Sequence, residues 1–591
     1  MLLIQAAPHP LGLACTVFRP NETHRQQDIF GIETQLSPER WKRLRESQEY
    51  AFYEEVFCRI PEEVFAELYS DSAATRPNTP VNVLVGALIL QHAHDWTFAE
   101  LMDRVDFDLK VRTALGLWSL DQEAFSRATL FNFLARVRDD MVATGRNRFE
   151  TAFDRLTDEQ RKRFGLNCSI QRCDSTQIGS NIRDYTRIEL LVEVVLRMWR
   201  VLNEAHKEEY AERFASYVGA KTSSQFLYRL SKSDITQTLE QLGQLYGWMA
   251  DALKADYGSM EIHRIVCRVF AEQFTRVEEK IAVRAATEIR SDSLQSPDDP
   301  EATYREKDGE EFHGFVLHAT ETADPQNAMQ LIVDVAVAPN NKDDSRILHD
   351  RLPGMHEKTP DLRELHTDAA YPSEDNDRLQ SGWGILAVQT AIRGRVAEAP
   401  FQIGRDEAGR LQVRCAAGHV VTSGSTAKHL KADFAAAHCA GCPFAGVCTA
   451  QKRAHGGRTF YFKEADEVRQ ARHRRLQTLP EERRTLRANV EATIKQFKAP
   501  CRNGKLRTRG RWGVSRYGFL RAMAINAGRI HRHLQRAQAD SGMPALAHCL
   551  SAACTRFPEP LRLLVCGAGT YRPQPDHRFN RARLTSLTLA A

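Results

Sequence analysis

The sequence of 591 residues predicts a mixed α/β protein that is divided into several parts. Helical hydrophobic periodicity dominates residues 38–165 and again residues 186–290. Strand-like runs occur at 168–178 and between 291 and 398, and a basic, helix-rich segment follows at 463–536. A single hydrophobic core stops growing near roughly 250–300 residues. We therefore expect the chain to form several structural units, each with its own hydrophobic core.

A compact helical domain is expected at 38–165, after an N-terminal extension of residues 1–37. Thr79 as N-cap and Pro80 at the first helical position predict the start of the helix VNVLVGALILQ. Thr97 and Glu100 predict a capping box before FAELMDRV. The later run TLFNFLARVR has a buried-type stripe formed by Leu130, Phe133, Leu134 and Val137. It could be a DNA-reading helix, and ordinary amphipathic packing also explains it.

The predicted sheet begins with CSIQRCDSTQI, inside a segment of residues 166–185. Apolar residues at helical spacing then indicate a helical insertion at 186–290. After the loop-like SDSLQSPDDP, the segment 291–398 supplies further strands in EFHGFVLHAT, NAMQLIVDVAVAP, LRELHTDAAYP and WGILAVQTAI. A long charged helix is expected at Leu479–Ala499 and should end at Pro500.

Positive charge is concentrated in one segment of the chain. Residues 463–536 contain 20 Lys and Arg against 6 Asp and Glu, although the formal net charge of the whole chain is only +5. This favours a polyanion such as DNA as partner, and a solvated basic helical surface is the alternative. Apolar stretches are too short for a membrane span, and the N-terminus lacks a basic secretory leader. We therefore expect a cytoplasmic protein with no membrane partner.

Three acids have the order that a metal site would need. Asp174 lies in the first strand, Asp368 at the end of a later strand, and Glu491 in a helix after the sheet. They can converge in an RNase H-like sheet, where a hairpin follows the first strand and the fourth strand returns parallel beside the first. Three carboxylates suit two Mg²⁺ or Mn²⁺ ions that clamp the attacking and leaving oxygens of a phosphoryl displacement. Taken singly, each acid is also explained as a turn former or a solvated side chain.

Glu491 is surrounded by bases at helical spacing. In one continuous helix, a common face would be shared by Arg484, Arg487, Glu491, Lys495 and Lys498. One acid among four bases suits a metal ligand beside a phosphate backbone. Ion pairing between residues four apart is the simpler alternative.

Four cysteines form the pattern C-x23-C-x2-C-x5-C within the segment 399–462. They are Cys415, Cys439, Cys442 and Cys448. In a reduced cytoplasm this pattern predicts a structural Zn²⁺ site, with His419 and His438 as substitute ligands and buried free thiols as the alternative. Residues 537–591 have no pattern that assigns a role.

Together these features resemble the DDE transposases of bacterial insertion sequences that have a helical N-terminal domain, an RNase H-like core and a cysteine-rich insertion. The resemblance covers about residues 40–536 and rests on RPNTPVNVLVGALILQ, CDSTQI, DPEATYREKDGEEFHGFVLHATET, HTDAAY and R-x3-E-x6-K. Arg487, Glu491 and Lys498 occupy the fixed positions of the last motif, and Arg484 stands where related transposases have tyrosine. The basic RTRGRWGVSRYGFLRAMAINAGRIHRHL resembles the family's C-terminal helix region.

The resemblance implies a transposase in which Asp174, Asp368 and Glu491 are catalytic and hold the two metal ions. A metal-activated water would cut a transposon end, and the freed 3′-hydroxyl would attack target DNA. Phosphate contacts would come from Arg484, Arg487, Lys495, Lys498, Arg507 and Arg509. Double-stranded DNA is the expected partner, and the pairing of two ends implies a homodimer. The alternatives are an inactive transposase-derived DNA-binding protein, or an RNase H-like nuclease or resolvase without strand transfer.

Overall fold

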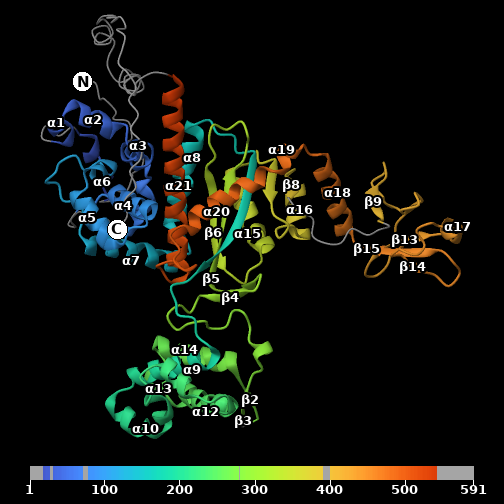
Figure 1. Ribbon diagram of the computed structural model, residues 1–591, viewed down its shortest axis with the longest axis horizontal. Coiled ribbons are helices and arrows are strands. Elements are labelled where there is room, and N and C mark those ends of the chain that lie inside the picture. The colour runs from blue at the N-terminus through green and yellow to red at the C-terminus, as the bar shows by residue number, and fades with distance from the viewer. Residues whose placement is uncertain (1–17, 27–30, 71–76, 279, 390–399, 542–591) are drawn as a thin grey trace, which may run out of the picture. The chain divides into compact units, whose positions relative to one another are not determined.

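The computed structural model describes residues 18–26, 31–70, 77–278, 280–389 and 400–541 (Figure 1). Residues 1–533 form one compact unit, and the described part of the second unit, 534–541, is the last part of helix α21. Within these ranges no helix is long and apolar enough to cross a membrane. Most of the predicted C-terminal tail, 542–591, and most of the N-terminal extension lie outside the described residues.

A mixed sheet of six strands lies at the centre of the first unit. Its strands are β1 (Ile170–Gly179), β4 (Thr303–Lys307), β5 (Glu310–Thr322), β6 (Ile332–Pro339), β7 (Glu364–Thr367) and β8 (Leu386–Gln389). β5 pairs antiparallel with β1, β4 and β6, while β7 runs parallel to both β1 and β8. The first strand is thus followed by antiparallel strands and then by a parallel return beside it. This is the order that the convergence of Asp174 and Asp368 requires.

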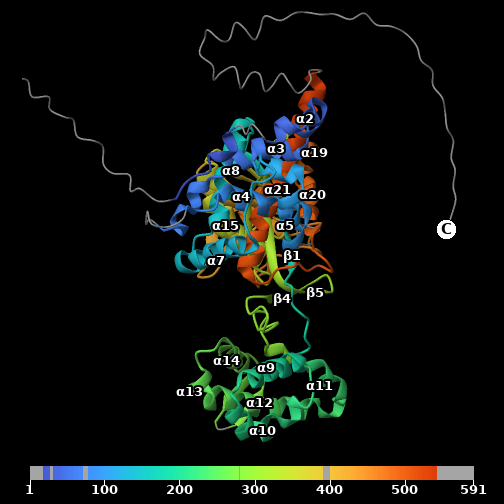
Figure 2. The same cartoon turned by 90° about the vertical axis from the view of Figure 1, so that its left-hand side faces the viewer.

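Helices cover both faces of this sheet (Figure 2). On one face, α15 (Asp344–Lys358) and α16 (Glu374–Gly382) bury Leu348, Leu352 and Leu379 near Cys173 of β1. On the other face, one large core joins Ile178 and Leu317 of the sheet to the N-terminal helices, to α20 (Val490–Lys498) and to α21 (Gly510–Ser541). Successive side chains of β1 point to opposite faces of the sheet, so Cys173 packs in one core and Ile178 in the other.

The N-terminal region is helical, as predicted. Its main helices are α2 (Pro38–Arg45), α3 (Gln48–Glu55), α4 (Val81–His94), α5 (Phe98–Phe107), α6 (Leu109–Ala114), α7 (Arg127–Thr144) and α8 (Arg148–Arg163). The capping box of Thr97 and Glu100 is confirmed, and so is the buried stripe of α7. The predicted Thr79 cap is wrong: α4 starts after Pro80, and the Glu62 carboxylate accepts its first N–H groups. A remote acid replaces the local cap.

Residues 187–273 form a group of helices with a core of its own (Figure 1). They are α9 (Arg187–Val201), α10 (Glu204–Val218), α11 (Ser223–Arg229), α12 (Ile235–Ala252), α13 (Lys254–Tyr257) and α14 (Glu261–Gln273), followed by a hairpin of β2 (Phe274–Val277) and β3 (Lys280–Val283). The chain returning from this group is anchored by Asp299, which accepts hydrogen bonds from the Ser180 hydroxyl and from the Gly510 N–H that begins α21. Asp298 pairs with Arg197 of α9 at 3.0 Å.

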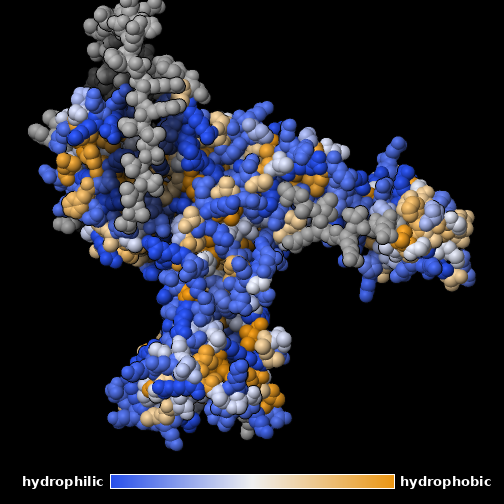
Figure 3. Space-filling view, viewed as in Figure 1, coloured by the Kyte–Doolittle hydropathy of each residue, from blue (hydrophilic) through white to orange (hydrophobic). Residues whose placement is uncertain are grey.

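The cysteine-bearing segment folds into small sheets. Its strands are β9 (Gln402–Arg405), β10 (Leu411–Arg414), β11 (Val420–Thr422), β12 (Gly424–Ser425), β13 (Leu430–Phe434), β14 (Gln451–Lys452) and β15 (Arg458–Phe462), with the short helix α17 (Ala436–Cys439). On the face seen in Figure 3, apolar residues gather over this segment, where Val420 and Val447 are exposed. Its core is separate from that of the main sheet.

The single helix predicted over Leu479–Ala499 is wrong. After α18 (Glu464–Thr478), the chain forms α19 (Glu481–Arg484), the 3-10 turn η6 (Leu486–Asn489) and then α20. The Arg172 guanidinium donates a hydrogen bond of 2.9 Å to the Leu486 carbonyl, an acceptor that a continuous α-helix would pair with the N–H of Val490. Arg484 therefore does not share a helix face with Glu491. As predicted, α20 ends just before Pro500.

A buried carboxylate connects the sheet to the helices above it. Glu321 of β5 is fully buried and accepts hydrogen bonds from Arg172 of β1 at 2.6 Å, from the Thr493 hydroxyl of α20 at 2.6 Å and from Arg529 of α21 at 2.8 Å. Three donors, two of them cationic, satisfy one carboxylate. Such a cluster stabilises a fold only when all of its members are paired.

We expect Glu321→Ala to destabilise the protein strongly, because it leaves Arg172 and Arg529 buried without their shared anion. Loss of one partner from a buried ion pair costs about 3–5 kcal/mol, which should lower the melting temperature by roughly 6 °C or more. Differential scanning calorimetry measures this. Glu310→Ala, at an exposed position of the same strand, is the control and should change the melting temperature little. Equal melting temperatures for the two variants would contradict the role of the cluster.

Candidate functional site

Two of the predicted acids lie on adjacent parallel strands. Asp174 belongs to β1, where it pairs with Ala319 of β5. Arg172 of β1 is aligned with His366 of β7, so extending this register by two residues brings Asp368 opposite Asp174. Residues that are aligned across strands point to the same face. Asp368 directly follows β7, and its Oδ1 accepts the N–H of Ala370 at 2.6 Å, which fixes the turn after the strand.

Arg487 links Asp174 to Glu491. Its Nη2 lies 2.8 Å from Oδ2 of Asp174, and its Nη1 lies 3.8 Å from Oε1 of Glu491. The side chains of Arg487 and Asp174 are only 16% and 14% exposed, whereas that of Glu491 is 58% exposed. The 3-10 turn before α20 brings Arg487 against the strand. The three side chains therefore form a line of alternating charge and not a cluster of three carboxylates.

A further acid, Asp344 at the start of α15, adds negative charge near Asp174. Its Oδ1 accepts a hydrogen bond of 2.6 Å from the hydroxyl of Ser175, the neighbour of Asp174 in β1. Burial raises the pKa of Asp174, and repulsion from Asp368 and Asp344 raises it further, while Arg487 acts in the opposite direction. The middle of β1 around Asp174 is thus an acidic region with too little compensating positive charge. Such a region favours a bound cation.

The predicted DNA-binding cations fall into two groups. Arg484, Lys495 and Lys498 are exposed, and in the described part of the chain their side chains form no ion pair. Arg507 and Arg509 instead contact the protein itself. Arg507 lies 3.8 Å from a carboxylate oxygen of Asp95, and Arg509 donates to the carbonyl of Asn181 and pairs with Asp298. These two arginines also have a structural role near the start of α21.

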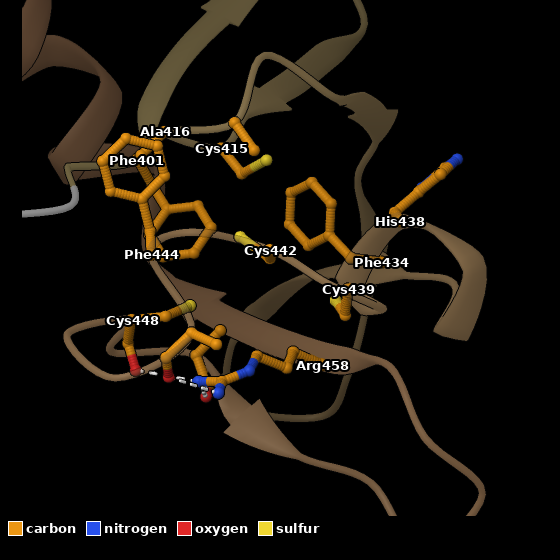
Figure 4. A pocket seen from close by; sticks show the side chains of 13 residues that line it. Phe401, Cys415, Ala416, Phe434, His438, Cys439, Cys442, Phe444, Cys448 and Arg458 are labelled. Carbon is orange, nitrogen blue, oxygen red and sulfur yellow. Dashed lines mark hydrogen bonds between the residues drawn. The ribbon is translucent and has the colours of Figure 1, made fainter.

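The four cysteines line one small cavity of about 30 Å³, which is closed by Phe401, Phe434 and Phe444 (Figure 4). Arg458 crosses the floor and donates hydrogen bonds to the carbonyl oxygens of Cys448 and Ala445. Burial raises the pKa of the Cys439 thiol, and the other three cysteines raise it further. His438 points away from the thiols and stacks on His419 at 4.4 Å. The sequence-predicted thiols are therefore neighbours, without the histidines.

Among the described residues, no three His, Cys, Asp or Glu side chains are close enough to hold a metal ion in this conformation. Sequence reasoning missed Asp344 and Glu321. Asp344 lies among ordinary helix-start acids, and Glu321 lies in a strand where an acid usually faces solvent. Only the pairing of β1 with β5 and the packing of α15 bring these residues to the site, so no local signal could have identified them.

Two segments of the chain match transposase families. Residues 40–136 match the family model described as "Transposase domain (DUF772)", and residues 414–531 match the one described as "Transposase DDE domain". The second match includes Arg487 and Glu491 but not Asp174 or Asp368. No curated protein and no solved structure matches the chain. The two matches, in this order on one chain with a helical N-terminal region, identify the protein as a DDE transposase of the insertion-sequence type.

Proposed function

We propose that this transposase cuts the ends of its element and joins them to target DNA with Asp174, Asp368 and Glu491 as its catalytic acids. The proposal rests mainly on the parallel register of β1 and β7, which brings Asp174 and Asp368 together on one face of the sheet. Arg487 connects the first of these acids to the helix that carries Glu491. The strand order supports an RNase H-like core.

The donor set fits Mg²⁺ or Mn²⁺, because carboxylate oxygens on a partly buried acidic edge suit a hard cation. When bound, two such ions stabilise the charge on the attacking and leaving oxygens of an in-line displacement at phosphorus. The chain's own residues position the DNA. Lys495 and Lys498 are exposed cations of α20, the helix that carries Glu491, and Arg484 is an exposed cation of α19. We expect all three to hold the phosphate backbone. Arg507 and Arg509 can bind the phosphate backbone only after they release their contacts with Asp95 and Asp298.

The helical residues 38–165 would bind the transposon end, and two copies of the chain would pair two ends. A joining assay with a donor fragment and a target plasmid tests the whole proposal. Joined product supports a transposase. Cleavage without joining would favour the nuclease alternative, and binding without cleavage would favour the inactive DNA-binding protein.

We expect Asp174→Asn, Asp368→Asn and Glu491→Gln each to abolish cleavage and joining, because each removes a charged metal ligand with little change in volume. Binding to the transposon end should stay within about twofold, since affinity comes mainly from phosphate contacts. Single-turnover cleavage in Mg²⁺ and a gel-shift assay measure the two effects. Asp361→Asn, at an exposed acid just before β7, is the matched control and should cleave normally. A near wild-type rate in any of the three variants would remove that residue from the site.

Lys498→Ala should weaken DNA binding without eliminating cleavage. Loss of one phosphate contact reduces the slope of log affinity against log salt by roughly 0.9 and affects all sequences alike. Glu491→Gln on the same helix should leave that slope unchanged. Salt-titrated fluorescence anisotropy measures both slopes. If α20 only carries solvated ion pairs, the two variants will give the same slope and the same cleavage as the wild type.

We also propose that Cys415, Cys439, Cys442 and Cys448 hold a structural zinc ion. The four thiols come from separate parts of the segment 399–462 and line one small cavity of about 30 Å³. Four thiolates leave no open position, so this zinc would stabilise the fold and would not take part in catalysis.

Purified protein should therefore contain about one zinc per chain by atomic emission spectroscopy. Cys442→Ser should lower the zinc content to near zero, while Cys267→Ser, a free cysteine of α14, should leave it unchanged. Addition of a chelator should lower the melting temperature of the wild type and not that of Cys442→Ser. A zinc-free wild-type protein prepared with reduced thiols would support buried free cysteines instead.

A further inference from the structure

We propose that Arg487 is the counter-ion of the acids around Asp174 and that it competes with a metal ion for the Asp174 carboxylate. The inference rests on the proposed function, since it takes Asp174 and Glu491 as metal ligands. It assigns Arg487 two partners in succession, first the carboxylates and then a DNA phosphate. Arg487 is in this sense a positioning residue that couples metal binding to DNA binding.

Both carboxylate oxygens of Asp174 already accept a hydrogen bond. Its Oδ1 accepts the N–H of Ser175 at 2.9 Å, and its Oδ2 accepts Nη2 of Arg487 at 2.8 Å. The other arm of the same guanidinium reaches toward Glu491. Arg487 therefore lies between two of the proposed metal ligands. Its positive charge repels a second cation at Oδ2, so the guanidinium and a metal ion compete for Asp174.

The surrounding charges explain why a cation is needed at this place. Asp344 and Asp368 both lie near Asp174, in the middle of β1. In the part of the chain that the structure describes, Arg487 is the one cation paired with Asp174, and neither Asp344 nor Asp368 has an ion pair. Without Arg487, the partly buried acids would repel one another uncompensated. Arg487 thus makes the metal-free site stable and at the same time competes with the metal.

Release of Arg487 would also free a phosphate ligand. Its Nε is buried and has no hydrogen-bond partner among the described residues, so the guanidinium is not fully satisfied in its present position. A planar guanidinium suits bidentate contact with a phosphate. Metal binding would therefore displace Arg487 from Asp174 toward the DNA backbone.

The test is the affinity of the full-length, DNA-free protein for Mn²⁺, measured by isothermal titration calorimetry. We expect Arg487→Gln to bind Mn²⁺ roughly tenfold more tightly than the wild type, because a neighbouring positive charge lowers a carboxylate's affinity for a proton by about one to three powers of ten and opposes a metal cation in the same sense. Arg229→Gln is the control: it removes the same charge from an exposed side chain of α11, outside the site, and should bind Mn²⁺ like the wild type.

Two further variants make the result decisive. Asp174→Asn should lose Mn²⁺ binding, and if it binds Mn²⁺ normally, the ligand assignment of the proposed function fails. If Asp174→Asn loses binding but Arg487→Gln binds Mn²⁺ as the wild type does or more weakly, only the counter-ion inference fails. Arg487→Met serves if the glutamine variant does not fold, because it removes the charge and keeps a long unbranched side chain. It should also bind Mn²⁺ more tightly than the wild type, and unchanged affinity would overturn the inference.

Discussion

The relation between helix and sheet at this site depends on one buried carboxylate, Glu321. Its three donors come from β1, α20 and α21, so one desolvated charge connects all the elements that surround the acids. A buried ion has a high desolvation cost, and only complete pairing offsets it. The cluster therefore tolerates little movement of α20 along the sheet. Thr493, one of its donors, lies two residues after Glu491 and sets how far that helix stands from Asp174.

Features of the fold that depend on local residue pattern and on strand order could be predicted from the sequence. Asp174 and Asp368 could be placed near one another because Asp174 lies in the first predicted strand, Asp368 ends a later one, and the intervening strands predict an antiparallel hairpin before a parallel return. The structure has that order, with β1 between β5 and β7. The Thr97 capping box and the buried stripe of α7 were predictable for the same reason, since both depend on residues three or four apart.

What could not be predicted depends on contacts between distant residues. Charges at helical spacing continue from Arg484 to Lys498 without a Gly or Pro, so nothing local marks the 3-10 turn at 486–489. At this turn the Leu486 carbonyl accepts a hydrogen bond from Arg172, which lies over 300 residues away in the chain. In the same way, Glu62 replaces the predicted cap of α4 from a separate helical turn. The periodicity of hydrophobic and charged residues carries no information on contacts between residues that are distant in the chain.

Because the helix is interrupted, Arg487 and the exposed lysines of α20 lie in different surroundings, whereas a continuous helix would place them on one face. On a single face, Arg487 and Lys498 would both meet solvent together with Glu491. The 3-10 turn instead directs Arg487 inward to the acids and leaves Lys495 and Lys498 exposed. The middle of β1 around Asp174 therefore keeps an excess of negative charge that attracts cations, while the outer surface of α20 keeps positive charge that attracts a polyanion. Lys495 lies one helical turn after Glu491, so in the proposed function a phosphate held by the outer cations would come close to that acid.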